Sequence, residues 1–155
     1  MEKMKIMLVD DEERFLETTR KLLARKGYDA VTAASGREAI RQLESRHIHI
    51  VILDVKMPLM DGIAALKEIK RRFPPVEVIM LTGHATVETA IEGLKSGATD
   101  YLMKPISIEA LIQKAEEAFA KQMLLEEKIR LAQGRLFMKS PREILKKAKD
   151  PSAPD

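Results

Sequence analysis

Five short apolar runs alternate with amphipathic segments along the chain, and this alternation constrains the fold more than any other feature. The runs have the length of β-strands and lie at residues 6–9, 28–33, 48–55, 76–81 and 100–103. A segment with apolar residues at helical spacing follows each run. Repeated strand–helix units predict an α/β fold, with five parallel strands in one sheet and helices wound on both of its faces.

Local signals predict where the helices begin and end. Gly27 is suited to end the first helix, and Ser35 to begin the second, with Glu38 as its capping-box partner. Pro74 follows the third helix, and Ser107 is suited to begin the last one. These boundaries also set where each strand must finish.

Polar side chains stand where four of the strands end. Asp10 and Asp11 follow the first strand, Asp54 closes the third, Thr82 follows the fourth and Lys104 follows the fifth. The carboxyl ends of parallel strands share one edge of a sheet, which is also where α/β proteins bind their ligands. We therefore expect these five side chains to lie together.

The residue types at this edge point to phosphate chemistry. Three carboxylates raise one another's pKa unless a cation lies between them. Mg²⁺ accepts oxygen ligands and keeps several waters, which leaves room for a phosphate group. A lysine neutralises further negative charge, and a threonine hydroxyl donates to an anionic oxygen. Together they suit phosphoryl transfer, in which positioning and charge stabilisation supply most of the catalysis.

Four spaced motifs carry a resemblance to a known family. They are Val9–Glu12, Leu53-Asp54 with Met57-Pro58 and Asp61-Gly62, Leu81–Ala85, and Tyr101–Pro105. Over about residues 4–122 the sequence resembles the receiver domains of two-component response regulators. The resemblance implies a flavodoxin-like, doubly wound (βα)5 fold with strand order 2-1-3-4-5.

The resemblance also implies a role for each polar residue. Asp54 would be the phospho-acceptor. Asp11 and Asp54 would bind Mg²⁺ directly, together with the backbone carbonyl of Lys56, and Asp10 would act through water. Lys104 would pair with Asp54 and then with the phosphoryl oxygens.

A second set of implied roles concerns the response to phosphorylation. Thr82 would turn toward the phosphoryl group, and Tyr101 would move inward behind it. The peptide bond before Pro105 would be cis. His84, beside the site, would influence how fast the acyl phosphate is lost.

Structural interpretations exist for several of these residues when each is taken alone. An acidic pair such as Asp10-Asp11 often caps a helix, and Asp11 could do so while facing the metal. Tyr101 suits a half-buried strand position as well as a switch. His47 and His49 enter a strand at the end away from the acids, which favours a structural role.

Composition narrows the class of protein. Cysteine is absent, which excludes disulfides and thiolate metal sites. No apolar run approaches the roughly 20 residues that span a bilayer, and the N-terminus does not resemble a signal peptide, so we expect a cytoplasmic protein without membrane contact. Residues 134–155 carry six basic and three acidic residues, which accounts for the net charge of +3. The neutral remainder does not favour nucleic-acid binding.

Apolar residues continue at heptad spacing beyond the expected end of the domain at residue 122. They are Leu111, Ala115, Ala118, Gln122, Leu125, Ile129, Ala132 and Leu136, with the one polar interruption at Gln122. We expect residues 123–137 to extend the last helix and residues 138–155 to form a basic, largely disordered tail. The extension either pairs with a second copy or another partner, or frays; the sequence leaves both open.

These features predict a receiver that accepts a phosphoryl group on Asp54 from a histidine kinase or phosphotransfer protein, in a Mg²⁺-dependent reaction. It would catalyse only its own phosphorylation and dephosphorylation, and would switch its surface for a downstream effector protein. We expect it to act alone, without an output domain; the alternative is that the chain is a piece of a longer regulator.

Three other functions fit less well. Haloacid-dehalogenase-type phosphatases place Asp-x-Asp on the first strand, a pattern that Asp10-Asp11-Glu12 does not match. A DNA-binding regulator would need a recognition helix, which the basic tail lacks. An adaptor that has lost the chemistry would not be expected to keep all five polar residues.

Overall fold

The computed structural model describes residues 3–55, 61–83 and 86–138. The chain divides into two compact units, residues 1–122 and 123–155. In the first unit the strands are β1 (Lys5–Val9), β2 (Asp29–Ala33), β3 (Ile50–Leu53), β4 (Glu77–Thr82) and β5 (Asp100–Met103). The helices are α1 (Glu13–Arg25), α2 (Gly36–Ser45), α3 (Gly62–Arg72), α4 (Val87–Lys95) and α5, which spans Ile108–Met138 and so enters the second unit.

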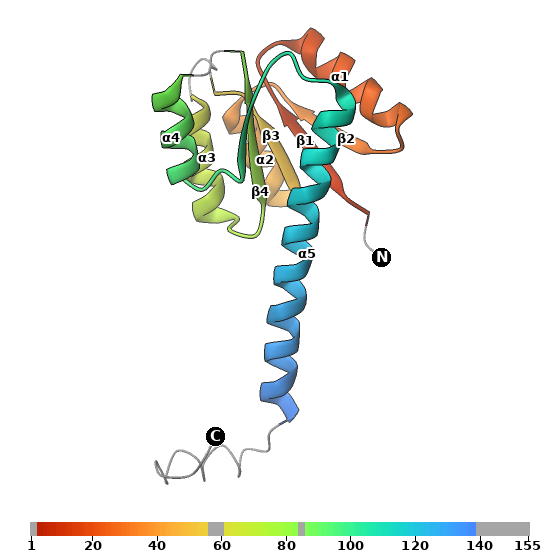
Figure 1. Ribbon diagram of the computed structural model, residues 1–155, viewed down its shortest axis with the longest axis vertical. Helices are drawn as coiled ribbons and strands as arrows, with labels where there is room; N and C mark the ends of the chain where they lie inside the picture. The colour runs from red at the N-terminus through yellow and green to blue at the C-terminus, as the bar shows by residue number, and fades with distance from the viewer. Residues whose placement is uncertain (1–2, 56–60, 84–85, 139–155) are drawn as a thin grey trace. The chain divides into compact units, whose positions relative to one another are not determined.

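All strand pairs in the sheet are parallel, and the order is β2-β1-β3-β4-β5 (Figure 1). The predicted fold class and strand order are therefore confirmed. Strand order reverses at β1, which has β2 on one side and β3 on the other. Ligands of such sheets bind beside the strand ends at this point.

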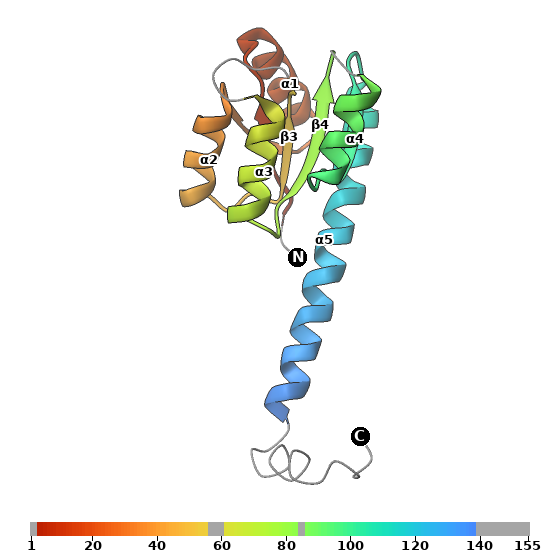
Figure 2. The same ribbon diagram turned by 90° about the vertical axis from the view of Figure 1, so that its left-hand side faces the viewer.

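Each face of the sheet has its own hydrophobic core. Side chains from alternate strand positions, such as Val51 and Met80, pack with α2 and α3. Their neighbours in sequence, such as Ile52 and Ile79, pack with α1 and the first turns of α5. Figure 2 shows α2, α3 and α4 side by side in front of the sheet. Burial on both faces explains why the central strands are continuously apolar.

Most predicted helix ends are confirmed. Gly27 has φ +89°, a left-handed conformation that glycine adopts without steric cost. The Ser35 hydroxyl accepts from the Glu38 N–H at 3.1 Å, but the Glu38 carboxylate accepts from the N–H of Ala34, one residue before the expected partner. The Ser107 hydroxyl likewise accepts from the first turn of α5.

In the second unit the described residues, 123–138, are helical. Four of their large apolar side chains are about half exposed: Leu124 58%, Leu125 54%, Ile129 50% and Leu131 47%. The predicted tail from residue 139 onward lies outside the described residues. Among the described helices, none is both long enough and apolar enough to cross a bilayer.

Candidate functional site

Three carboxylates converge at the carboxyl ends of β1 and β3. One oxygen from each of Asp10, Asp11 and Asp54 lies within 4.8 Å of the others. The backbone brings them together because the Asp54 N–H donates to the carbonyl of Val9 at 2.9 Å, which continues the β1–β3 ladder by one residue. Asp10 and Asp54 are buried, at 1% and 5% exposed, whereas Asp11 is exposed.

Asp10 is held firmly by the protein. Its Oδ1 accepts from the Glu12 N–H at 2.9 Å, and its Oδ2 accepts from the Lys104 ammonium at 2.5 Å. The residue at the cap of α1 is Glu12, whose side chain makes no capping hydrogen bond, so the suggestion that Asp11 caps this helix is wrong. The aspartate that binds the start of α1 is Asp10, one residue earlier.

Lys104 reaches the site from the end of β5. We expected it to pair with Asp54, but the ion pair present is with Asp10, with Glu12 farther away at 3.9 Å. The ammonium also lies 3.9 Å from the centre of the Phe15 ring, within range of a cation–π contact. Phe15 was not among the residues singled out from the sequence, because this contact requires α1 and the end of β5 to come together in the fold.

The fourth and fifth strands are joined directly beside the site. The Lys104 N–H donates to the carbonyl of Thr82 at 2.9 Å, and the Lys104-Pro105 peptide bond is cis, as predicted. The Thr82 side chain is fully buried, and that of Tyr101 partly so. The Tyr101 hydroxyl lies 3.0 Å from the hydroxyl of Thr89 on α4, a residue that sequence analysis did not single out.

Gly62 brings α3 against the backbone of Asp54. A Cβ atom at this position would lie 2.5 Å from the Cα of Val55 and closer still to the carbonyl oxygen of Asp54. The Gly62 N–H donates to the Val55 carbonyl at 2.7 Å, and the Asp61 side chain caps the helix by accepting from Ala64. The Asp61-Gly62 pair therefore begins α3.

Two predicted site residues, Lys56 and His84, lie outside the described residues, as do Met57 and Pro58. His47 and His49 lie at the opposite edge of the sheet from the carboxylates. His49 is fully buried, and its Nδ1 accepts from the Lys5 N–H at 2.9 Å. The structural role expected for these histidines is consistent with this placement.

The charge and spacing of the carboxylates fit a divalent cation. The three carboxylates and the Lys104 ammonium, which contacts Asp10, sum to a formal charge of −2. Opposite ligands on Mg²⁺ are about 4.2 Å apart, slightly less than the 4.8 Å within which the three oxygens lie. This arrangement suits a hard cation that binds some of the carboxylates directly and reaches the rest through water.

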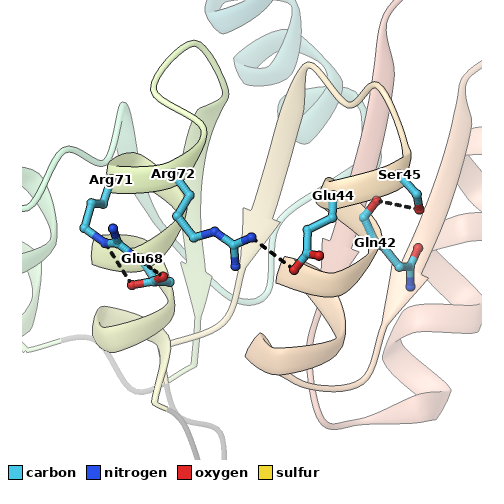
Figure 3. Close-up of polar contacts among 6 residues, drawn as sticks. All are labelled: Gln42, Glu44, Ser45, Glu68, Arg71 and Arg72. Carbon is cyan, nitrogen blue, oxygen red and sulfur yellow. Dashed lines mark hydrogen bonds and ion pairs between the residues drawn. The ribbon is translucent and has the colours of Figure 1, made fainter.

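Two surface depressions in the described part of the receiver lie elsewhere. One of about 480 Å³ is lined by Glu13, Glu17 and Glu38 with apolar neighbours, and one of about 370 Å³ lies between α2 and α3. In the second, the glutamates are neutralised by arginines (Figure 3): Arg72 lies 3.1 Å from Glu44, and Arg71 2.5 Å from Glu68. Neither depression is lined by the three aspartates.

Comparison with known proteins decides the family. Residues 6–116 match the model of the response regulator receiver domain. The chain belongs to this family. The receiver is 41% identical over 121 residues to the transcriptional regulatory protein ZraR of Escherichia coli O157:H7, which covers 78% of this chain and 27% of that protein. The receiver thus spans about a quarter of the length of this curated relative.

Solved structures agree. A response regulator receiver domain from Clostridium thermocellum superimposes with a TM-score of 0.74 and 38% identity, over 79% of this chain and 98% of that one. NtrX from Brucella abortus, in complex with ADP, superimposes with a TM-score of 0.78 and 32% identity, over 84% of this chain but 30% of that one. The likeness covers a whole receiver in the first case and one part of a longer regulator in the second.

Proposed function

We propose that the receiver accepts a phosphoryl group on Asp54 from the phosphohistidine of a histidine kinase or phosphotransfer protein, in a Mg²⁺-dependent reaction. The observation that supports this most strongly is the meeting of three aspartates within 4.8 Å at the end of β1 and β3, with Lys104 beside them. An Asp54 oxygen forms the new P–O bond as the P–N bond to the histidine breaks. The reaction belongs in the cytoplasm.

The metal would be held by Asp11 and Asp54 directly, with the backbone carbonyl of Lys56, and by Asp10 through water. The indirect role of Asp10 is supported by its contacts, since both of its oxygens already accept hydrogen bonds from the protein. When bound, the cation neutralises charge on the phosphoryl oxygens and on the carboxylates.

Lys104 and Thr82 would act on the phosphorylated form. Lys104 is 2.5 Å from Asp10, beside Asp54, so rotation of its flexible stem is enough to bring the ammonium to a phosphoryl oxygen. Thr82 ends β4, the neighbour of β3, and its hydroxyl would donate to another phosphoryl oxygen. Tyr101 would then move inward and change the surface offered to an effector protein.

Mass spectrometry of the intact chain after incubation with a small phosphodonor and Mg²⁺ tests this function. We expect one phosphoryl group on the wild type and none on Asp54→Asn. Asp29→Asn, an exposed aspartate on β2, is the matched control and should be phosphorylated like the wild type. Modification that persists in Asp54→Asn would contradict the proposal.

We further propose that the receiver acts on itself and on no separate substrate. Phosphorylation and hydrolysis would both occur at Asp54, with residues 1–122 as the receiver. Sustained turnover of p-nitrophenyl phosphate would instead favour the rival phosphatase. The stand-alone role stays a prediction, and so does the downstream effector.

The second unit would supply a contact between copies. Leu125 and Ile129 lie four residues apart on one face of the helix, and each is about half exposed. Covering them would bury apolar surface that water contacts in the single chain. We expect sedimentation equilibrium to show a dimer that Leu125→Glu with Ile129→Glu dissociates and Lys128→Gln does not. A monomeric wild type would refute this pairing.

A further inference from the structure

Helix α4 is held to the receiver by few apolar contacts. Of its nine residues, all of them described, only Gly93 is buried, whereas Val87, Ile91 and Leu94 are 74%, 48% and 50% exposed. Elements with little buried apolar surface open at low free energy. The position of α4 therefore depends strongly on the polar contacts at its first turn.

Those contacts centre on the hydroxyl of Thr89. The Thr86 N–H donates to Thr89 Oγ1 at 3.0 Å, while the Thr89 N–H donates to Thr86 Oγ1 at 3.1 Å, which completes a capping box. Thr89 Oγ1 also lies 3.1 Å from the carbonyl oxygen of Thr86, to which it donates. One side chain thus stabilises the whole first turn.

The same hydroxyl binds Tyr101, at 3.0 Å from its phenolic oxygen. A hydroxyl has one hydrogen and two acceptor sites. Thr89 Oγ1 is also 3.0 Å from the Thr86 hydroxyl, so four polar atoms of the protein surround this one hydroxyl. Of these four, the Tyr101 hydroxyl is the one that lies outside the first turn of α4, and it joins that turn to β5.

Tyr101 is also positioned by the sheet. Tyr101 lies opposite Met80 in the β4–β5 register, and Met80 stands two residues before Thr82 on β4. A Cβ added to Gly93 would lie 3.5 Å from its Cδ2 and 3.6 Å from the Met80 side chain, so the ring packs between β4 and α4. It therefore contacts both the strand that ends in Thr82 and the helix whose first turn Thr89 stabilises.

We propose that Thr89 is a positioning residue that holds Tyr101 against α4 in the resting receiver, so that inward movement of Tyr101 breaks this bond and leaves the α4 cap one partner short. This inference rests on the proposed phosphorylation of Asp54. Loss of one neutral hydrogen bond changes an equilibrium by about fivefold. Removal of the Thr89 hydroxyl should therefore favour the inward position of Tyr101 by about that factor.

The chain offers a direct measurement, because it has two tyrosines and Tyr28, on the far edge of the sheet, serves as the internal reference. We would record NMR spectra of full-length chains with labelled tyrosine rings, with and without beryllofluoride and Mg²⁺. In resting Thr89→Val, the Tyr101 signal should move toward its position in beryllofluoride-bound wild type. Thr89→Ser keeps the hydroxyl and should match the wild type.

Beryllofluoride affinity gives the second readout. Thr89→Val and Tyr101→Phe should each bind about fivefold more tightly than the wild type, and the double variant should gain nothing more, because both changes remove one bond. Thr86→Ala weakens the cap but keeps the Tyr101 contact, so it should leave both the Tyr101 signal and the affinity near the wild-type values.

The outcomes separate the two proposals. If wild type responds to beryllofluoride while resting Thr89→Val keeps the wild-type Tyr101 signal and affinity, the role of Thr89 is refuted alone. Additive effects in the double variant, or equal effects of Thr86→Ala and Thr89→Val, also refute it. If beryllofluoride binds equally to wild type and Asp54→Asn, the proposed function fails and the role of Thr89 with it.

Discussion

The amino ends and the carboxyl ends of the parallel strands form the amino edge and the carboxyl edge of the sheet. These two edges bury polar groups in opposite ways. At the amino edge, the buried Glu77 accepts from the Thr99 hydroxyl, and Lys70 donates to two backbone carbonyls at 2.8 Å each. The Gln122 amide donates to the carbonyls of His49 and Pro75, at 3.3 and 2.6 Å. Most of these groups are matched by a partner of the complementary kind, as buried polar groups in stable proteins are, whereas the buried Gln122 Oε1 accepts no hydrogen bond from the described residues.

At the carboxyl edge, like charges are brought together instead. Asp10, Asp11 and Asp54 meet there, and among the described residues the Lys104 ammonium pairs with Asp10. The fold places these groups close at a cost in electrostatic free energy. Hydrogen bonds to complementary partners thus predominate at the amino edge of this receiver, and concentrated negative charge marks the candidate functional edge.

The strongest test of the carboxyl edge is its packing. Gly62→Ala places a methyl group against the backbone of Asp54 and Val55, so α3 must shift. We expect a loss of about 3 kcal/mol in the free energy of unfolding, typical of severe overpacking. Urea denaturation measures it. Gly83→Ala has no atom within 4 Å of its added Cβ and is the control; equal losses in both would contradict the close approach.

Removing a negative charge should lower the free energy of unfolding at the amino edge and raise it at the carboxyl edge. Glu77→Ala leaves the Thr99 hydroxyl without its acceptor in a part-buried place, and we expect a loss of about 2 kcal/mol. Asp11→Asn relieves repulsion at an exposed position, and we expect a gain of about 1 kcal/mol in metal-free buffer. Urea denaturation of both variants without Mg²⁺ measures the two changes in the free energy of unfolding. If both variants were destabilised, the proposed difference between the two edges would be contradicted.

Mg²⁺ should stabilise the folded receiver by binding at the carboxyl edge alone. An ion that binds only the folded state raises stability with its concentration, by about 1.4 kcal/mol for each tenfold step above the dissociation constant. Thermal denaturation at increasing Mg²⁺ should show this rise in wild type and a much smaller one in Asp11→Asn. A variant at the amino edge, Thr99→Val, should rise as the wild type does. A flat wild-type response would exclude a magnesium site.

The smallest effect is expected from pH at the amino edge. Burial lowers the pKa of Lys70 from its ordinary 10.5, with a smaller opposing contribution from Glu77. Between the lowered folded-state pKa and 10.5, the unfolded chain binds more protons than the folded one, so the Lys70 contribution to stability rises with pH. In urea titrations at increasing alkaline pH, the free energy of unfolding of wild type should therefore rise relative to that of Lys70→Met. A difference between the two that does not change with pH would contradict the lowered pKa of Lys70.

Much of the fold could be predicted because its signals are local. Gly27, Ser35 and Ser107 mark helix ends through contacts within a few residues, and apolar runs mark the strands. The carboxylate cluster also followed from the sequence, since parallel strands must end at one edge. Strand order came from the family resemblance, because spacing alone does not say which strands are neighbours.

The residues at the strand ends could be identified from the amino-acid sequence, and their positions imply that Asp10, Asp11 and Asp54 meet. Tertiary structure decided their partners. Lys104 pairs with Asp10 across 94 residues of chain, and Thr89 with Tyr101 across 12. The physical reason is range: capping and periodicity act between neighbours in the chain, whereas a side chain's partner depends on how whole elements pack.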